Sequence, residues 1–306
     1  MEVQSIGVDL GRGYVKGYTE FNGKVKTCLF QSIVGDSRKL EDYSSYKDPI
    51  YLKVDDESYF VGELAEKESY NPISNFSDSK TTDIAKKLLY ALFSKLAESN
   101  YVKICIGVPN KTFNNSTRNK IKNEYVARHL KIFDEINGTT KDVTIVKADI
   151  FREADAALFH EINVHPELKN EHLGTVIVGF RTTEESYFDT GMKFNDKLSS
   201  TIEVGNRTVL DIIQKNLLRK NISKSLNEID SSKEYNKLKD IGYKNLLERI
   251  NQDMEMRWIN YSEMHIFLGG GTSKNFNVDF IPDKFEMIED PQMAVSKGLY
   301  FIAKNL

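Results

Sequence analysis

Three glycine-rich turns carry the residues that could bind a phosphate-containing ligand. The first is Asp9-Leu10-Gly11-Arg12-Gly13-Tyr14-Val15-Lys16, between two strand-like segments. Its glycines let backbone N–H groups converge on an anion, because no Cβ stands in the way. Lys16 adds a point charge for a phosphate, and Asp9 can hold a hydrated magnesium ion opposite it. Taken alone, the segment is equally well explained as a glycine-rich hairpin with a surface lysine.

The other two turns lie in the second half of the chain. Gly179-Phe180-Arg181-Thr182-Thr183-Glu184 again joins two strand-like segments, and its hydroxyls and amides suit a phosphate, although an ordinary hairpin explains it as well. Leu268-Gly269-Gly270-Gly271-Thr272-Ser273 follows an apolar strand directly. Its bare backbone offers a flat surface for a ribose or base, and Thr272 can start a helix aimed at phosphates. The set of three predicts a nucleotide clamped between two domains.

Other cofactor and metal chemistry is not indicated. The chain has neither a single-turn dinucleotide fingerprint nor a Walker-type sequence. The five histidines show no zinc spacing and are expected on the surface or in packing contacts. The two cysteines, Cys28 and Cys105, lie in apolar strand-like segments and predict neither a disulfide framework nor a thiolate metal site.

The elements that position these turns indicate a layered α/β architecture. Periodicity and turn signals predict strands at 3–10, 14–21, 25–30, 50–54, 59–61, 102–108, 143–148, 174–178, 185–188 and 264–268. They predict helices at about 81–98, 116–129, 152–161, 207–218, 232–251 and 291–303. Each half begins with a strand, a glycine-bearing turn and a returning strand. The polar stretch 32–80 is interpreted as an inserted small subdomain, and His165-Pro166 as the crossing into the second domain.

Length and charge narrow the class of protein. A chain of 306 residues fits two domains, and 40% hydrophobic with 28% charged residues is typical of a globular protein. A net charge of -3 argues against a broad DNA-binding face. The N-terminal segment does not have the pattern of a secretion signal, and the apolar runs are too short to span a bilayer. The expected location is the cytoplasm, without membrane association.

The motifs resemble the actin, sugar kinase and heat-shock chaperone superfamily, and especially its ParM-type plasmid-segregation proteins. Residues 9–16 look like the first phosphate loop of that family, 179–183 like the second, and 268–271 like its adenosine motif. Tyr59-Phe60-Val61-Gly62-Glu63-Leu64-Ala65 resembles the "vGexA" segment, and Ile106-Gly107-Val108-Pro109 the "GLP" strand end. Pro291-Gln292-Met293-Ala294-Val295-Ser296-Lys297-Gly298 resembles the "PQFANxxG" opening of the last helix. These matches run in order across nearly the whole chain.

The resemblance implies a two-lobed actin-like fold with a nucleotide cleft between the lobes. Domain I would comprise 1–165 with 290–306, including the small subdomain at about 32–80, and domain II would comprise 166–289. ATP or GTP would be held with Mg²⁺, which Asp9 would bind through water. The implied phosphate-binding residues are Asp9, Gly11, Arg12, Gly13, Tyr14, Lys16, Gly179, Phe180, Arg181, Thr182 and Thr183. Those implied for the adenosine are Gly269, Gly270, Gly271 and Thr272.

The resemblance also assigns catalytic positions. Glu153 occupies the place of a Gln or Glu that orients the attacking water and can accept its proton. Alternatively, Glu153 is a solvated acidic residue at the start of a helix, where its negative charge interacts favourably with the helix dipole. Where the family usually has an Asp two residues before the glycine of the second loop, this chain has Ile177, so slow hydrolysis is expected. Glu184 stands where an Asp is common.

The leading hypothesis is therefore a polymerising ATPase or GTPase of the bacterial cytoskeleton, whose filaments segregate plasmids. Its partners would be its own copies and a ParR-like centromere-binding adaptor, with plasmid DNA contacted only indirectly. The alternative is a small-molecule (sugar or acid) kinase of the same fold. Such a kinase needs a catalytic Asp in the cleft, for which the sequence offers no convincing candidate. A third hypothesis is a scaffold that does not polymerise.

Overall fold

Two units, each with a sheet of its own, make up residues 2–306, which the computed structural model describes. Unit 1 comprises the chain up to His160 together with Val295–Leu306, and unit 2 is Glu161–Ala294. The chain crosses from one unit to the other inside the helix that follows Arg152 and again at the start of the last helix.

Unit 1 is built on a ten-stranded sheet with the order β3-β2-β1-β8-β10-β9-β5-β6-β4-β7. Its strands are β1 (Gln4–Leu10), β2 (Tyr14–Phe21), β3 (Lys24–Gln31), β4 (Ile33–Asp36), β5 (Ile50–Val54), β6 (Glu57–Val61), β7 (Ile73–Ser74), β8 (Tyr101–Val108), β9 (His129–Asp134) and β10 (Thr139–Arg152). Its helices are α1 (Glu63–Glu68), α2 (Asp83–Leu96), α3 (Asn115–Tyr125), most of α4 (Glu153–Val164) and nearly all of α8 (Ala294–Lys304).

Three neighbouring strands of this sheet run parallel and end side by side. β1 pairs with β8 and β8 with β10, both in parallel register, so Leu10, Val108 and Arg152 close the same edge of the sheet. β2 returns antiparallel from the turn after β1. In open sheets with parallel strands, ligands bind outside the carboxyl ends of these strands. The first glycine turn and the start of α4 both lie at this edge.

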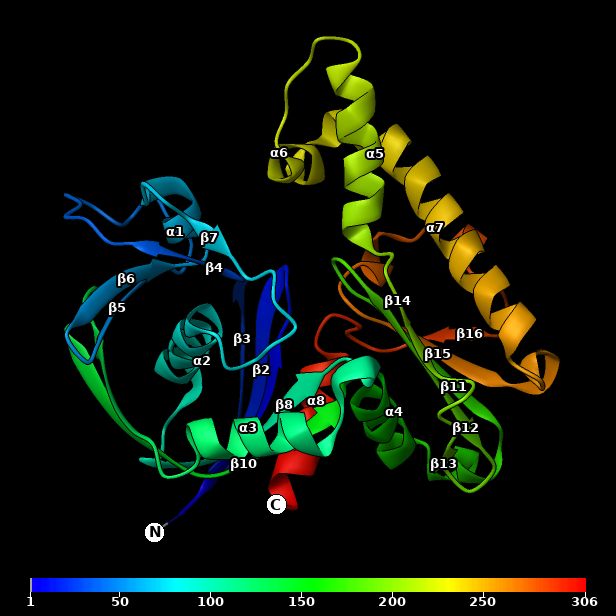
Figure 1. Ribbon diagram of the computed structural model, residues 1–306, viewed down its shortest axis with the longest axis horizontal. Coiled ribbons are helices and arrows are strands. Elements are labelled where there is room, and N and C mark those ends of the chain that lie inside the picture. The colour runs from blue at the N-terminus through cyan, green and yellow to red at the C-terminus, as the bar shows by residue number, and fades with distance from the viewer. Residues whose placement is uncertain (1) are drawn as a thin grey trace. The chain divides into compact units, whose positions relative to one another are not determined.

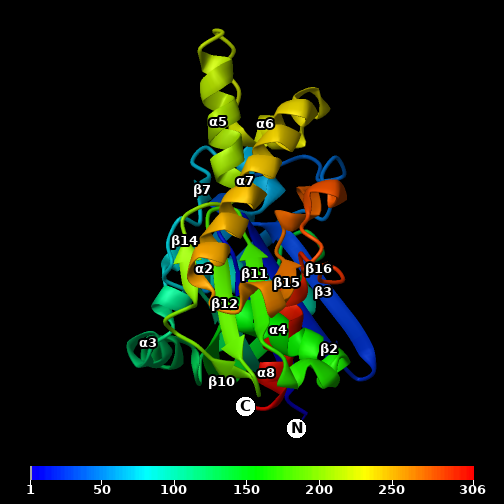
Figure 2. The ribbon, with the colours of Figure 1, turned by 90° about the vertical axis from the view of Figure 1, so that its right-hand side faces the viewer.

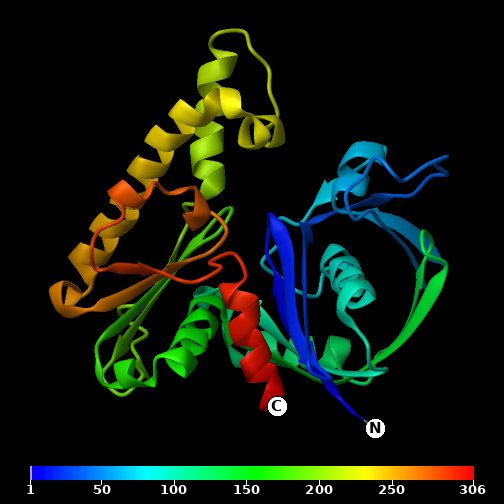
Figure 3. The same cartoon turned by 180° about the vertical axis from the view of Figure 1, so that it is seen from behind.

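Two helices fix the central strands because glycines let them approach closely. A Cβ at Gly17 on β2 would lie 2.6 Å from a methyl carbon of Leu96 in α2, and one at Gly7 on β1 would lie 2.0 Å from the Ser296 carbonyl oxygen in α8. Within unit 1, α2 lies beside β2 and β3 in Figure 1, and α8 runs along the same group of strands in Figure 3. α2, predicted at about 81–98, begins after Thr82, whose hydroxyl accepts the Ala85 N–H at 3.2 Å.

One predicted helix is too long, and the strand that follows it was missed. α3 ends at Tyr125, because Ala127 has a φ of +64° and its N–H donates to the Ile145 carbonyl oxygen at 2.8 Å. β9 then pairs with β10 on one side and with β5 on the other. Strands from segment 32–80 thereby continue the main sheet, while Phe60, Leu64 and Ala65 form a small apolar cluster of their own.

Unit 2 holds the sheet β13-β12-β11-β15-β16, with β14 paired to β12. Its strands are β11 (Leu173–Val178), β12 (Thr183–Asp189), β13 (Lys193–Phe194), β14 (Ser200–Ile202), β15 (His265–Gly269) and β16 (Phe285–Met287). Its helices are α5 (Asn206–Leu218), α6 (Leu226–Ser231) and α7 (Asn236–Arg257), which lie together in Figures 1 and 2. β11 and β15 are parallel, so the second and third glycine turns follow neighbouring strand ends.

Both cysteines are buried and free. No helix in residues 2–306 is long and apolar enough to cross a bilayer.

Candidate functional site

The first glycine turn brings a carboxylate and an ammonium group together on adjacent strands. Asp9 on β1 and Lys16 on β2 are cross-strand neighbours, and Lys16 Nζ donates to Asp9 Oδ2 at 2.7 Å. Both side chains are largely buried, at 6% and 14% exposure. A Cβ at Gly11 would lie 3.4 Å from Lys16 Nζ and 2.7 Å from the Tyr14 carbonyl oxygen. The glycine therefore keeps the backbone bare beside this pair.

The same turn is held from outside by Ser32. The Ser32 hydroxyl donates to the Gly11 carbonyl oxygen at 2.6 Å, and the Ser32 N–H donates to the Gly13 carbonyl oxygen at 2.9 Å. Arg12, predicted to bind phosphate, forms an ion pair with Asp78. Tyr14, another predicted ligand residue, is 38% exposed at the start of β2.

Glu153, the predicted catalytic residue, opens α4 at the same sheet edge. Gly107 on β8 makes room for it, since a Cβ there would lie 3.0 Å from Glu153 Cγ. Burial raises the pKa of the Glu153 carboxyl group, the positive charge of Lys80 opposes that rise, and the nearby Asp9 adds to it. The structure thus places Asp9, Lys16 and Glu153 near one another. A carboxyl group with a raised pKa in such a place is suited to accept a proton.

Lys80 is the residue of this group that the sequence did not indicate. Its Nζ donates to the Leu10 carbonyl oxygen at 2.8 Å and lies 3.5 Å from Glu153 Oε1. It precedes the cap of α2 in a polar segment, where a lysine is ordinarily solvated. No periodicity or motif distinguishes it from its neighbours, so only the fold identifies it.

The residues present fit a magnesium ion only in company with phosphate oxygens. Among residues 2–306 no group of three or more His, Cys, Asp or Glu side chains could hold a metal by itself. Mg²⁺ usually takes one or two carboxylates and completes its shell with waters and substrate phosphates. Asp9 supplies one such carboxylate, so magnesium would arrive with the nucleotide rather than reside in the protein.

In unit 2 the second turn and the glycine run are joined by Thr272. Its hydroxyl donates to the Gly179 carbonyl oxygen at 2.8 Å, and its N–H donates to that of Val178 at 3.1 Å. Gly270 has a φ of +92°, and a Cβ there would lie 2.4 Å from the Val178 carbonyl oxygen. Only glycine can take this conformation at this distance. The third turn is therefore a fixed support for the second rather than a flexible connector.

The start of α5 also rests on the second turn. The N–H groups of Asn206 and Arg207 donate to the Gly179 and Phe180 carbonyl oxygens at 3.2 and 2.7 Å. Next to them, the Tyr243 hydroxyl donates to Asn206 Oδ1 at 2.8 Å and accepts from Asn275 Nδ2 at 3.1 Å. These polar groups from α5, α7 and the segment after the glycine run bond to one another beside the second turn, and the sequence did not single them out.

Not every predicted ligand residue of the second turn is available to a ligand in this conformation. Thr183 is fully buried and its hydroxyl donates to the Val204 carbonyl oxygen at 2.9 Å, which gives it a supporting role. Arg181 is exposed and lies 3.6 Å from Glu203. Thr182 is partly exposed, and its carbonyl oxygen closes the turn by accepting the Gly179 N–H at 2.9 Å.

Ile177 is buried directly before this turn. It is 5% exposed, and its Cδ1 lies 2.8 Å from where a Cβ of Gly269 would stand. Its cross-strand partner is Glu184, which is 2% exposed and accepts a hydrogen bond from the Thr201 hydroxyl at 2.6 Å. A carboxylate is thus present one strand away from the position where the family usually has Asp.

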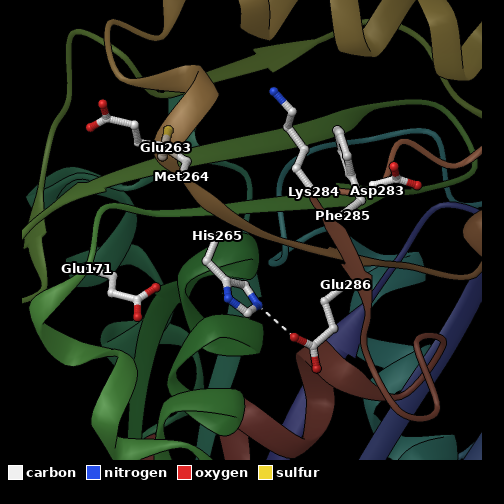
Figure 4. A pocket seen from close by; sticks show the side chains of 8 residues that line it. All are labelled: Glu171, Glu263, Met264, His265, Asp283, Lys284, Phe285 and Glu286. Carbon is white, nitrogen blue, oxygen red and sulfur yellow. Dashed lines mark hydrogen bonds and ion pairs between the residues drawn. The ribbon is translucent and has the colours of Figure 1, made fainter.

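A hollow of about 510 Å³ elsewhere in unit 2 is separate from these residues. It is lined by Glu171, Glu263, Met264, His265, Asp283, Lys284, Phe285 and Glu286, and His265 Nε2 lies 2.6 Å from Glu286 Oε2 (Figure 4). None of the sequence-predicted site residues lines it.

Comparisons with known proteins agree with the motif order. Residues 7–154 match the model of the N-terminal domain of actin-like proteins. The whole chain superposes on a subunit of a 15-stranded ParM filament from Clostridium botulinum with a TM-score of 0.83, at 18% identity and 100% coverage of both chains. The protein has the actin-like fold.

Other proteins of this fold give the same result. The archaeal actin homologue Ta0583 matches with a TM-score of 0.80 at 16% identity, over 98% of this chain and 99% of that one. Its complex with ADP matches with a TM-score of 0.79 at 15% identity, again over 98% and 99%. Curated protein sequences give no significant match. The predicted actin-like α/β fold with two domains is thereby confirmed.

Proposed function

We propose that this chain binds ATP or GTP with Mg²⁺, hydrolyses it, and assembles in its nucleotide-bound state into filaments that segregate plasmid DNA. One nucleotide would engage residues of both units: the first turn in unit 1, and the second turn and glycine run in unit 2. The observation that carries the proposal is the cluster of Asp9, Lys16 and Glu153 at the carboxyl edge of the parallel strands.

Each residue of the cluster has a chemical part in this proposal. Lys16 would contact the phosphates as a point charge, and Asp9 would hold the magnesium ion that arrives with them. Glu153 orients a water molecule whose oxygen bonds to the γ-phosphorus while the bond to the bridging oxygen breaks. The electron pair leaves on the nucleoside diphosphate, and the proton of the water passes to Glu153.

Filament formation is supported by the likeness to filament subunits. An open filament requires head-to-tail surfaces that do not close into a ring. Copies of the chain would then be its main partners, and the small subdomain at about 32–80 is a candidate contact by analogy. A ParR-like adaptor would bind the centromere-like DNA, which is consistent with a net charge of -3. The proposed location is the bacterial cytoplasm.

Sedimentation and light scattering test the proposal. With Mg-ATP or Mg-GTP the protein should form large particles above a critical concentration, and these should disassemble as phosphate is released. Glu153→Gln should bind nucleotide and assemble, but hydrolyse about 100-fold more slowly, so that its particles persist. The absence of nucleotide-dependent particles across a wide concentration range would contradict the filament proposal. Sugar-dependent ADP release would indicate a kinase instead.

The role in plasmid segregation needs a test of its own. A small helix-rich DNA-binding protein encoded just downstream should co-sediment with the filaments and join them to its DNA site. A plasmid that carries both genes should be lost more often when this chain carries Glu153→Gln. An unchanged loss rate would count against segregation while leaving filament assembly intact.

A further inference from the structure

Lys80 is buried, unlike lysines on a protein surface. Its side chain is 5% exposed, and lysines are rarely this buried unless their charge is paired. Its backbone carbonyl oxygen accepts a hydrogen bond from the hydroxyl of the fully buried Tyr125 at 2.5 Å. Its ammonium group donates to the Leu10 carbonyl oxygen at 2.8 Å. The residue is therefore held at both ends, and its charge has a fixed place at the end of β1.

The charge of Lys80 faces Glu153. The 3.5 Å between Lys80 Nζ and Glu153 Oε1 is an ion-pair distance, in a setting where water screens little. Lys16, the other lysine of the cluster, is already bonded to Asp9 at 2.7 Å. Arg152, next to Glu153 in the chain, forms an ion pair with Asp155. Lys80 thus pairs directly with the Glu153 carboxylate, and the charge of Lys16 also lowers the pKa of that group.

We propose that Lys80 is a positioning residue of the hydrolytic site, whose ammonium group, anchored on the Leu10 carbonyl oxygen, keeps the Glu153 carboxylate ionised and oriented beside the first turn. This inference rests on the proposed hydrolytic function. A carbonyl oxygen can be satisfied by any N–H or O–H donor, so an anchoring role alone needs no positive charge. The charge is what Glu153 requires, because burial and the charge of Asp9 both favour its protonated form.

Three substitutions separate charge from anchoring. Lys80→Met removes the ammonium group, Lys80→Gln keeps an N–H donor without charge, and Lys80→Arg keeps the charge. Lys86→Met is the matched control, since Lys86 in α2 also pairs with a glutamate, Glu124 at 3.4 Å, which is not part of the Glu153 cluster. Circular dichroism and thermal unfolding establish which variants fold.

The first measurement is independent of nucleotide. Glutamate carboxyl carbons labelled with ¹³C are titrated in the nucleotide-free protein, and Glu153→Gln assigns the Glu153 signal. Losing an opposite charge at this distance should raise the Glu153 midpoint by about one pH unit or more in Lys80→Met and Lys80→Gln. In Lys80→Arg and Lys86→Met the midpoint should stay near the wild-type value. An unchanged midpoint in folded Lys80→Gln would overturn the proposal, even if Lys80→Met does not fold.

The second measurement follows hydrolysis against pH. In the uncharged variants the acid limb should move to higher pH by the same amount, with kcat lowered about tenfold at pH values on that limb and KM nearly unchanged. Lys80→Arg should restore the limb. If Lys80→Arg is folded and performs no better than Lys80→Gln, charge is not the reason for Lys80. If the wild-type protein does not hydrolyse nucleotide, the proposed function fails and the hydrolytic role with it, whereas the titration still reports whether Lys80 and Glu153 are coupled.

Discussion

Gly270→Ala is expected to damage unit 2 far more than the same change one residue later. The φ of +92° at Gly270 lies where an alanine is strained, and the new Cβ would stand 2.4 Å from the Val178 carbonyl oxygen, 2.7 Å from its nitrogen and 2.8 Å from its carbonyl carbon. These backbone atoms cannot yield, because β11 is hydrogen-bonded to β12 on one side and to β15 on the other. Backbone strain of about 1–3 kcal/mol and forced overpacking of about 1–3 kcal/mol together predict a loss of about 2–6 kcal/mol.

Gly271→Ala is the matched control. A Cβ at Gly271 would meet nothing closer than the Gln292 side chain at 3.6 Å, an ordinary contact, so the expected change lies within about 0.5 kcal/mol. Urea unfolding followed by tryptophan fluorescence is the assay, since the single tryptophan, Trp258, is 2% exposed in the core of unit 2. Equal unfolding midpoints for the two variants would refute the role given to Gly270. Gly270→Ala should also weaken ADP binding, because it displaces the glycine run from the second turn.

Two further predictions concern carboxylates in unit 2. Ile177→Asp should speed phosphate release several-fold, because it restores the carboxylate usual at this position. It should also lower the free energy of unfolding by about 2 kcal/mol, because it buries a charge opposite Glu184. A loss of stability with no faster phosphate release would contradict this prediction. Burial raises the pKa of Glu185 to about 8, although Arg257 pairs with it. The folded state therefore binds one more proton than the unfolded state between about pH 5 and pH 8. The free energy of unfolding should fall as the pH rises through that range. Glu185→Gln should flatten this fall in urea unfolding, and an unchanged slope would mean that other groups cause it.

The sequence predicts those features that local chemistry determines. Asn22-Gly23, a strong hairpin signal, joins β2 to β3, and both turn residues have a positive φ. Thr82 caps α2, and the glycine run stands at the end of β15. In each case the signal lies within a few residues of the feature it predicts.

Features that depend on distant partners could not be predicted in this way. β9 alternates buried and exposed residues, with Leu130 and Ile132 inside, but its first residue was assigned to the preceding helix. Nothing local shows that Ala127 takes a positive φ, because the carbonyl oxygen of Ile145 on another strand holds its N–H. Lys80 is hidden for the same reason, since its partners are 70 and 73 positions away in the chain.

The proposed function requires one nucleotide to engage the first turn of unit 1 and the turns of unit 2. Isothermal titration with Mg-ATP and Mg-GTP, below the assembly concentration, tests it in the wild-type protein and in two variants. Lys16→Met removes the charged contact in unit 1, and Thr272→Val removes the hydrogen bond that joins the two turns of unit 2. We predict one nucleotide bound per chain, and an affinity for nucleotide that is about tenfold or more weaker in each variant. Two independent sites, or one variant that binds as tightly as the wild type, would contradict it.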